Sequence, residues 1–442
     1  MKRSAWRRPR DDDADGDETD ESTTERSQVV GVVAASAWQV PTSSKLCSIC
    51  NMKALQFATT LSLTATTASA FVPSSSSCSK RKQHSAVSST SASASTRGIQ
   101  HDLTFTPPDT LGEGQITEQL CADAAEKMKR VMVPVSKDVS ETGYAGISYI
   151  HWPAERKTAT LPLLLVPGFD SSALELRRLG PQLAKLGVET YVVDLLGWGF
   201  TQLDGIKSFS ADSKVEALKG FWQVVGGNGE VVVGGCSLGG ASVITLAAEN
   251  LYKADGEEEN GFVRGTILID AQGFIDGIGP MSFLPSPVAR LGIKFLQSEG
   301  LRNQASQMSY FNPEAYATDD AMKISRLHCV RDGWEDGMLS FMQSGGFKPK
   351  ERVAQISVPS LILWGRQDGI LEKEFASKFV ETMEDAELQW VEECGHVPHL
   401  EQPEAVARYI MDFLSSDKLR PNEDEKANSP ANILDGILNF LN

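Results

Sequence analysis

The stretch VVVGGCSLGGAS, residues 231–242, decides how this chain folds. Its three valines predict a buried parallel strand, and the apolar residues after Ser237 recur at helical spacing. Gly235 and Gly239 lie two residues before and after this serine, where side chains would collide in a sharp strand-to-helix turn. Such a turn exposes the Ser237 hydroxyl above the sheet and points the N–H of Leu238 into the same space. An ordinary glycine-rich loop has the same local pattern. Other parts of the sequence are therefore needed to tell this sharp turn from such a loop.

Length and composition restrict the answer. The 442 residues are 41% hydrophobic, which fits a globular core, and no apolar run reaches the ~18 residues of a membrane span. Residues 1–100 hold 12 of the 42 Lys and Arg but only 9 of the 58 Asp and Glu, so residues 101–442 have a net charge of −19. So acidic a body argues against nucleic acid as a partner. The seven cysteines show no pairing pattern, which argues against a disulfide scaffold.

The first hundred residues do not have the composition of a folded domain. Residues 1–51 contain the acidic run DDDADGDETDESTTE, which predicts a disordered leader. Residues 52–70 have the layout of a signal peptide ending in Ala-Ser-Ala, and residues 71–100 have the serine-rich, basic composition of a transit peptide. The junction ASAFVP resembles the bipartite presequences of plastids of complex, red-type origin. Because a signal peptide works only at the N-terminus, residues 1–51 are either that leader or a gene-model extension ahead of Met52.

The predicted location is therefore a plastid. Two alternatives stay open, the secretory pathway and a low-complexity leader that carries no address.

Beyond residue 100, predicted strands alternate with predicted helices, which indicates an α/β protein with a doubly wound, mostly parallel sheet. A short helix is expected first, over residues 116–131. Strands are predicted at 143–152, 161–168, 189–199 (a strand that ends in a glycine turn), 230–237, 265–271, 358–365 and 386–393. Helices are predicted at 171–187, 210–226, 238–251 and 402–416, and between the last two strands.

Two polar residues directly follow strands late in the chain. Asp368 follows the strand 358–365, and His396 follows the next strand, 28 residues further on. Ligand chemistry in such a sheet belongs at the carboxyl ends of the strands, and the order Ser237, Asp368, His396 is the one expected for this elbow. Serine is a weak nucleophile, so His396 would take its proton while Asp368 fixes the histidine tautomer. Asp270 also ends a strand and remains the alternative acid.

On these residues the body, about 143–417, resembles the α/β-hydrolase superfamily of esterase and lipase type. LLLVPGFDSS (163–172) corresponds to the turn after the third strand of that family. The resemblance implies an oxyanion hole made by the backbone N–H groups of Phe169 and Leu238. Pro167 stands where many members have histidine. The segments PGFDSS, LGWGF and RLHC…WED resemble a plant and algal plastid subgroup, and distantly similar pheophytinase-like members share the PGF turn.

The family places a helical cap after its sixth strand, which here implies residues 274–350. This insertion holds five of the chain's eleven methionines and six phenylalanines. It would either bind apolar substrates, since methionine adapts to flexible partners, or use these residues for its own core. The tail 418–442 ends in an amphipathic stretch that favours docking on the body and leaves peripheral membrane contact open.

The predicted function is a serine hydrolase that cleaves carboxylic esters, with apolar lipid or prenyl esters as substrates and with no metal or organic cofactor. A thioesterase, a peptidase or a carbon–carbon bond hydrolase could use the same residues, and a non-catalytic binding protein is the alternative from another class. His399 is expected to be a hydrogen-bonded loop histidine, and His328 a packing residue, with a lining role left open. The sequence sets no oligomeric state.

Overall fold

The computed structural model describes residues 99–112, 115–227, 229–250 and 261–419, all within the compact unit Ser69–Asn442. The predicted leader, apart from residues 99 and 100, and the predicted tail beyond Leu419 lie outside the described residues. Among the helices that the structure describes, none is long and apolar enough to cross a bilayer.

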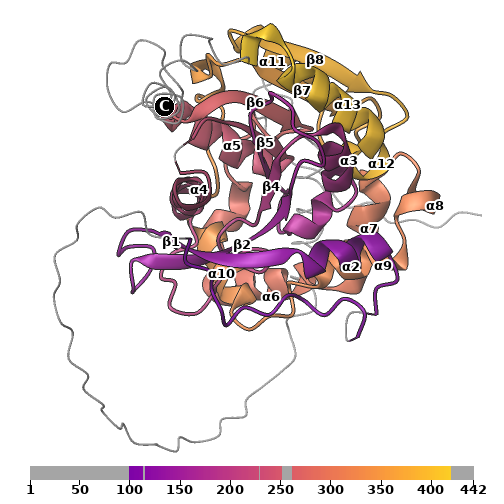
Figure 1. The fold of residues 1–442 in the computed structure, drawn as a ribbon. Helices are drawn as coiled ribbons and strands as arrows, with labels where there is room; N and C mark the ends of the chain where they lie inside the picture. Colours follow the sequence, from indigo (N-terminus) through magenta and orange to yellow (C-terminus); the bar gives the residue numbers. More distant parts are fainter. Residues whose placement is uncertain (1–98, 113–114, 228, 251–260, 420–442) are drawn as a thin grey trace, which may run out of the picture. The chain divides into compact units, whose positions relative to one another are not determined.

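One sheet of eight strands organises the described residues (Figure 1). The strands are β1 (Met128–Pro134), β2 (Tyr144–Trp152), β3 (Leu163–Val166), β4 (Thr190–Val193), β5 (Val231–Cys236), β6 (Val263–Ile269), β7 (Ser360–Gly365) and β8 (Ala386–Val391).

The order of these strands across the sheet is β1-β2-β4-β3-β5-β6-β7-β8. The pairs β1–β2 and β2–β4 are antiparallel, and all the other pairs are parallel. The predicted α/β class and the doubly wound, mostly parallel sheet are therefore confirmed. In the sheet, β4 lies on one side of β3 and β5 lies on the other, so the direction of strand addition reverses after β4. In an open sheet this reversal places the ligand crevice outside the carboxyl ends of β3 and β5.

Helices cover both faces of the sheet and bury a core on each. In β3, Leu164 and Val166 point into one core, and Leu163 and Leu165 point into the other, as the two-residue period of a strand requires. The first core is closed by α4 (Ala211–Val225), α5 (Leu238–Glu249) and α11 (Glu374–Thr382), and the second by α2 (Gln119–Glu126), α3 (Leu179–Leu186) and α13 (Pro403–Leu414).

The predicted helix at 116–131 is only half right. Residues Gln119–Glu126 form α2, but the chain then extends into β1, which pairs with β2 from Met128↔Ile150 to Pro134↔Tyr144. Val131 and Val133 point toward the core, and their neighbours are exposed or half-buried. This alternation fits a strand, which forms because the segment pairs with the otherwise free edge of β2. The sheet consequently begins before residue 143.

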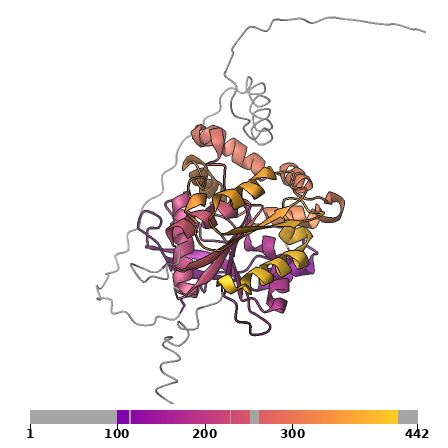
Figure 2. The same ribbon diagram turned by 90° about the horizontal axis from the view of Figure 1, so that it is seen from above.

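The predicted helical cap is present between β6 and β7. It contains α6 (Ser286–Leu296), α7 (Glu299–Ser309), α8 (Pro313–Tyr316), α9 (Asp319–Arg326) and α10 (Trp334–Gln343), with a 3₁₀ turn at Gly279–Phe283. These helices lie on one side of the sheet, and α13 lies on the opposite side (Figure 2).

Some of the methionines and phenylalanines of the cap pack against the body. Met338, Phe341, Met342 and Phe347 are buried, and they belong to the first core of the body rather than to a separate core of the cap. Phe283, by contrast, is 88% exposed.

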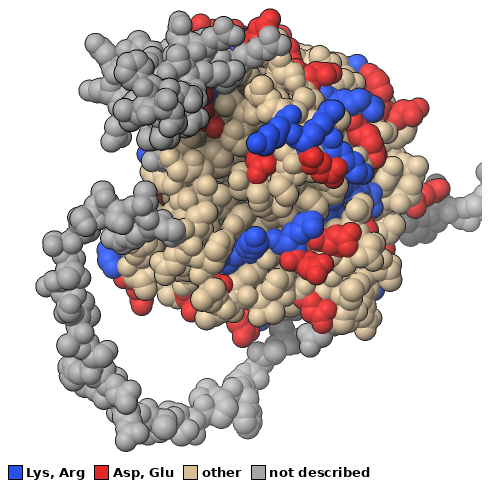
Figure 3. Space-filling model, viewed as in Figure 1, with Lys and Arg blue, Asp and Glu red and all other residues tan. Residues whose placement is uncertain are grey.

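The charged surface is mixed rather than uniform. On the face shown in Figure 3, Lys and Arg side chains form a broken band among Asp and Glu side chains, with apolar and uncharged residues between them.

Candidate active site

Ser237 stands at a strained turn between β5 and α5. Its φ of 49° and ψ of −121° are rarely adopted by a residue with a side chain, and such strain persists only where neighbours enforce it. Three backbone hydrogen bonds do so here. The Ser237 N–H donates to the carbonyl of Ile269 (2.9 Å), and the Ser237 carbonyl accepts from the N–H groups of Gly240 (2.9 Å) and Gln272 (2.8 Å).

The glycines around this serine are required by contact distances. A Cβ on Gly235 would lie 2.4 Å from the carbonyl oxygen of Gly239, and a Cβ on Gly239 would lie 2.3 Å from that of Pro167. Both obstacles are backbone atoms, which cannot rotate away. The steric reason inferred from the sequence for the glycines at minus two and plus two is therefore confirmed.

The structure brings Ser237, His396 and Asp368 into one hydrogen-bonded chain. The Nε2 atom of His396 lies 2.9 Å from the Ser237 hydroxyl oxygen, and its Nδ1 atom lies 2.8 Å from an oxygen of Asp368. The three residues come from the loops after β5, β8 and β7, at the carboxyl edge of the sheet. His396 is 7% exposed, so the link between serine and carboxylate is largely shielded from water.

Asp368 is held as a carboxylate. Its other oxygen accepts the N–H groups of Ile370 (2.7 Å) and Leu371 (3.1 Å). Burial by itself would raise the pKa of Asp368, but the charge of His396 and the hydrogen bonds to this carboxyl outweigh burial and lower the pKa. An ionised Asp368 can therefore accept the Nδ1–H of His396 and fix the tautomer that leaves Nε2 facing Ser237.

Asp270, the alternative acid, lies beside this chain but does not bond to His396. It is fully buried at the end of β6 with a φ of 41°, and its Oδ1 atom accepts the N–H of Gly365 at 2.9 Å. Burial and the neighbouring Asp368 charge raise the pKa of Asp270 well above its usual range. Two adjacent buried carboxyls do not both ionise, so Asp270 keeps the proton.

The two predicted oxyanion donors flank Ser237. Leu238 is the first residue of α5, and Phe169 follows Gly168, whose added Cβ would lie 3.5 Å from the Cβ of Ser237. In the described part of the chain, neither the Phe169 N–H nor the Leu238 N–H donates to a protein acceptor. The Gly168 N–H is bonded to Glu175 (3.2 Å), which steadies the turn that precedes Phe169.

A pocket of about 230 Å³ opens onto Ser237 and His396. The cap supplies much of its wall, through residues that the sequence pattern did not single out. The lining combines apolar side chains with hydroxyl and guanidinium groups: Phe169, Ala305, Ala321, Ile324, Val397 and Leu400, with Ser171, Ser306, Ser309, Ser325, Tyr310, Arg177 and Arg302.

The loop that carries His396 is tied to the cap. The His396 N–H donates to the carbonyl of Ser309 at 2.7 Å. The buried Glu401 carboxylate accepts N–H groups of Phe311 and Asn312 on the cap and of Gly395 beside the histidine, at 3.1, 3.1 and 2.6 Å. The cap therefore positions the histidine loop as well as covering the pocket.

His399 lies in the short helix α12 (Pro398–Glu401), beside Glu175 of the pocket wall. The Nε2 atom of His399 lies 2.9 Å from Glu175 Oε1, within ion-pair distance, but neither ring nitrogen has a hydrogen-bond partner among the described residues, so the expected hydrogen-bonded loop histidine is not found. Although burial alone would raise the pKa of Glu175, the interaction with His399 lowers it.

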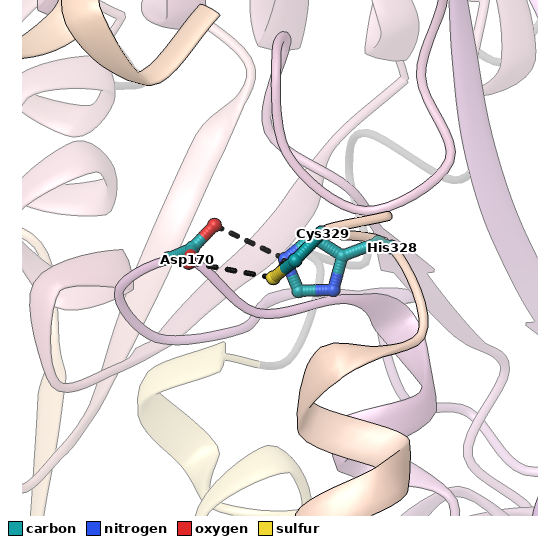
Figure 4. Close-up of side chains that lie close together, drawn as sticks. All are labelled: Asp170, His328 and Cys329. Atoms are coloured by element: carbon teal, nitrogen blue, oxygen red, sulfur yellow. Dashed lines mark hydrogen bonds and ion pairs between the residues drawn. The ribbon is translucent and has the colours of Figure 1, made fainter. Parts of the chain in front are cut away.

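His328 also has a structural partner rather than a place in the pocket wall. It lies 1% exposed, with Nε2 3.1 Å from Asp170 Oδ1 (Figure 4). Cys329 is beside it, with Sγ 3.7 Å from Asp170 Oδ2.

Three groups among the described residues have the composition of a metal site. In the first, formed by Asp270, Asp368 and His396, the last two are hydrogen-bonded to each other, and Asp270 accepts the N–H of Gly365. In the Asp170–His328–Cys329 group, the Arg302 guanidinium donates to both Asp170 and Cys329, so a cation already stands there.

The third group contains Glu175, Cys236 and His399. Burial raises the pKa of the Cys236 thiol well above its usual value, so this sulfur stays protonated and is a poor metal ligand. That the protein uses no metal and no organic cofactor stays a prediction.

Comparison with known proteins agrees with this geometry. Residues 163–409 match the sequence model of the Alpha/beta hydrolase family. The Arabidopsis thaliana protein named Alpha/beta hydrolase domain-containing protein VTE7 is 32% identical over 254 residues, covering 58% of this chain and 74% of that protein. A 2-hydroxy-6-oxononadienedioate/2-hydroxy-6-oxononatrienedioate hydrolase of Paraburkholderia xenovorans is 28% identical, covering 56% of this chain and 83% of that protein. Lipase 1 of Psychrobacter immobilis is 26% identical, covering 58% and 77%.

Among solved structures, a thermophilic esterase from Thermogutta terrifontis superposes with a TM-score of 0.52 at 21% identity, covering 66% of this chain and 99% of that one. At that identity the likeness concerns the fold alone. The family match covers more than half of the chain and includes the elbow at Ser237 and the loops that carry Asp368 and His396. The chain therefore belongs to the alpha/beta hydrolase family.

Proposed function

We propose that this protein is a serine hydrolase that cleaves carboxylic esters through an acyl-enzyme on Ser237. The observation that carries the proposal is the continuous hydrogen-bonded chain from Asp368 through His396 to Ser237 on the wall of the pocket. Membership of a hydrolase family adds support.

In the first half of the proposed reaction, Nε2 of His396 takes the proton of the Ser237 hydroxyl as the oxygen attacks the ester carbonyl carbon. Negative charge moves to the carbonyl oxygen, where the N–H groups of Phe169 and Leu238 donate to it. Asp368 stabilises the imidazolium that forms. His396 then gives its proton to the leaving alkoxide, the alcohol departs, and the acyl group remains on Ser237.

The second half repeats this sequence with water as the nucleophile. His396 removes a proton from water, the oxygen of which attacks the acyl carbon, and the same two N–H groups donate to the negatively charged oxygen that forms. Collapse of the tetrahedral intermediate releases the carboxylic acid and returns the proton to Ser237. The balance is one ester and one water consumed, one acid and one alcohol formed.

Apolar esters are the proposed substrates, and a plastid the proposed location. Support for the first comes from the pocket wall, where Ala305, Ala321, Ile324 and Leu400 offer apolar surface beside the serine. A volume of about 230 Å³ is below the ~300–1,000 Å³ of sites for drug-sized ligands, so this pocket suits an acyl chain of moderate length. Support for the plastid comes from the composition of residues 52–100.

A carbon–carbon bond hydrolase is the second candidate. The observation in its favour is the similarity to the Paraburkholderia xenovorans hydrolase. One assay distinguishes the two candidates: the purified protein is given a p-nitrophenyl ester or a 2-hydroxy-6-oxo-dienoate, and kcat/KM is measured for each. The substrate with the higher kcat/KM identifies the reaction.

The decisive experiment is labelling with a fluorophosphonate probe, which reacts with an activated serine. We expect the wild type to be labelled and to hydrolyse p-nitrophenyl butyrate, Ser237→Ala to do neither, and Ser282→Ala, at a half-buried serine in the 3₁₀ turn of the cap, to match the wild type. A folded wild type that takes no label and cleaves no ester from acetate to laurate would leave the fold to a binding role.

A further inference from the structure

Asp170 directly follows the proposed oxyanion donor Phe169 and is bonded almost entirely by the cap. One carboxylate oxygen accepts from Nε2 of His328 (3.1 Å) and from the indole N–H of Trp334 (2.9 Å). The other accepts from the guanidinium of Arg302, which also donates to the backbone carbonyl of Asp170 at 3.3 Å. Asp170 is 1% exposed, so these groups stand in place of water.

The backbone of Asp170 is itself strained. Its φ of 45° lies in the left-handed region of the backbone map. A residue with a side chain adopts this conformation only at an energetic cost, as at other strained backbone sites. Within the residues that the structure describes, only four other non-glycine residues have positive φ, and Ser237 and Asp270 are among them. Strain at Asp170 persists because the surrounding bonds oppose its relaxation.

The cap residues that bond to Asp170 are fixed in their turn. Arg302 on α7 also donates to the carbonyls of Leu296 (2.8 Å) and Ser325 (3.2 Å) and to the sulfur of Cys329 (3.1 Å). One arginine therefore links α6, α9 and the turn before α10 to the carboxylate of Asp170. Movement of any of these segments would disturb the same carboxylate.

The charge of Asp170 makes its loop sensitive to separation from the cap residues that bond to it. Burial raises the pKa of Asp170, but His328, Arg302 and Trp334 outweigh burial and hold it below the usual value. Burial lowers the pKa of His328, but Cys329 and Asp170 outweigh burial and raise it to about 10. An ionised carboxylate deprived of these partners would have to return to water, and its loop would move with it.

The cluster also brings together residues of three segments that stood out in the sequence. Asp170 belongs to PGFDSS, His328 and Cys329 to RLHC, and Trp334 to the WED segment. They are up to 164 residues apart in the chain, yet Figure 4 shows Asp170, His328 and Cys329 side by side.

We propose that Asp170 is a positioning residue through which the docked cap holds the Phe169 N–H toward the oxyanion. The inference rests on the proposed function, because it takes Phe169 as an oxyanion donor. It adds that the oxyanion hole is assembled by Arg302, His328 and Trp334 of the cap, so that the hole is complete only when the cap is docked.

The test compares Asp170→Asn and Trp334→Phe with the wild type. Asp170→Asn keeps the shape of the side chain but removes its charge, and Trp334→Phe removes one donor and leaves the cluster otherwise in place. The matched control is Asp320→Asn, which changes another cap carboxylate that joins the body, at the N–H groups of Thr117 (2.8 Å) and Glu118 (2.7 Å), and which is not among the residues that line the pocket.

Three measurements are made on each full-length protein with p-nitrophenyl butyrate: kcat, KM and the affinity for a trifluoromethyl ketone, which forms an oxyanion on Ser237. For Asp170→Asn and Trp334→Phe we expect kcat and ketone affinity to fall together, by roughly 10- to 100-fold and less for the tryptophan, with KM changed by about twofold or less. Asp320→Asn should match the wild type in all three.

The outcomes separate the two proposals. A folded wild type that neither hydrolyses the ester nor binds the ketone overturns the proposed function. An active wild type with Asp170→Asn and Trp334→Phe variants that keep kcat and ketone affinity while losing thermal stability overturns the positioning role, because Asp170 would then only stabilise the fold. Should Asp170→Asn fail to fold, Trp334→Phe decides alone by the same two readouts.

Discussion

Asp270 and Asp368 end neighbouring strands, and one carboxyl oxygen of each lies within 4.8 Å of the other and of a ring nitrogen of His396. Only Asp368 is hydrogen-bonded to that ring. The two carboxyls consequently differ in ionisation and in role, which leads to separate expectations for activity and for stability.

Replacing Asp368 should affect catalysis far more than replacing Asp270. Asp368→Asn removes the carboxylate that fixes the His396 tautomer and should lower kcat by roughly 10³–10⁴-fold. Asp270→Asn keeps a neutral side chain of the same shape and should cost at most about tenfold. Steady-state kinetics on p-nitrophenyl butyrate measure both. The reverse ranking would assign the role of the triad acid to Asp270.

The same asparagine variant should change how stability depends on pH. The pKa of Asp270 is raised on folding, so its contribution to stability is complete below the unfolded value near 3.8 and is lost as pH rises toward the raised folded value. Above pH 4 the folded wild type holds a proton that the unfolded chain releases. Thermal unfolding from about pH 5 to about pH 9 should therefore show the Tm of the wild type falling relative to that of Asp270→Asn. Parallel curves would mean that Asp270 is ionised in the fold.

The elbow should tolerate no side chain at Gly239. Gly239→Ala would place a Cβ 2.3 Å from the Pro167 carbonyl oxygen, and we expect a loss of stability of roughly 1–3 kcal/mol or more together with loss of activity. The control is Gly292→Ala in the exposed interior of α6, where nothing lies within 4 Å of the new Cβ. It should gain about 0.5–1 kcal/mol from helix propensity. Denaturant unfolding gives both values, and equal effects would remove the steric explanation.

Ester preference should rise with acyl length and then level off. Each methylene buried against Ala305, Ile324 or Leu400 contributes about 0.8 kcal/mol, a factor of roughly four in kcat/KM, until the pocket of about 230 Å³ is full. The measurement is a p-nitrophenyl series from acetate to laurate, run beside pheophytin and a galactolipid. A purified enzyme that prefers acetate and leaves both lipids intact would contradict the apolar-substrate proposal.

Residues 52–100 should direct a fluorescent protein to the plastid. The predicted bipartite presequence places Phe71 directly after the signal cleavage site, so Phe71→Ala should leave the fusion outside. Microscopy of the two fusions in an alga with complex plastids tests this, with Phe57→Ala in the predicted signal segment as the matched control. Import that is indifferent to Phe71 would rule out this kind of presequence.

Much of the fold could be predicted because its signals are local. Valine runs and helical spacing are properties of neighbouring residues, so the strands at 231–236 and 360–365 were found within a residue or two. The segment 128–134 was not, because its strand conformation depends on pairing with the edge of β2, a contact that propensity does not encode.

The sequence by itself determined the elbow around Ser237, since the glycine requirement there is steric, and the candidates Asp368 and His396, since parallel strands present their carboxyl ends on one edge. Only the tertiary structure decided that His396 bonds to Asp368 rather than to Asp270, because both acids end adjacent strands and 2.8 Å contacts depend on side-chain placement. The contacts of Asp170 with Arg302, His328 and Trp334 likewise depend on tertiary packing. Residues 132 to 164 positions apart meet there only once the cap has docked on the sheet.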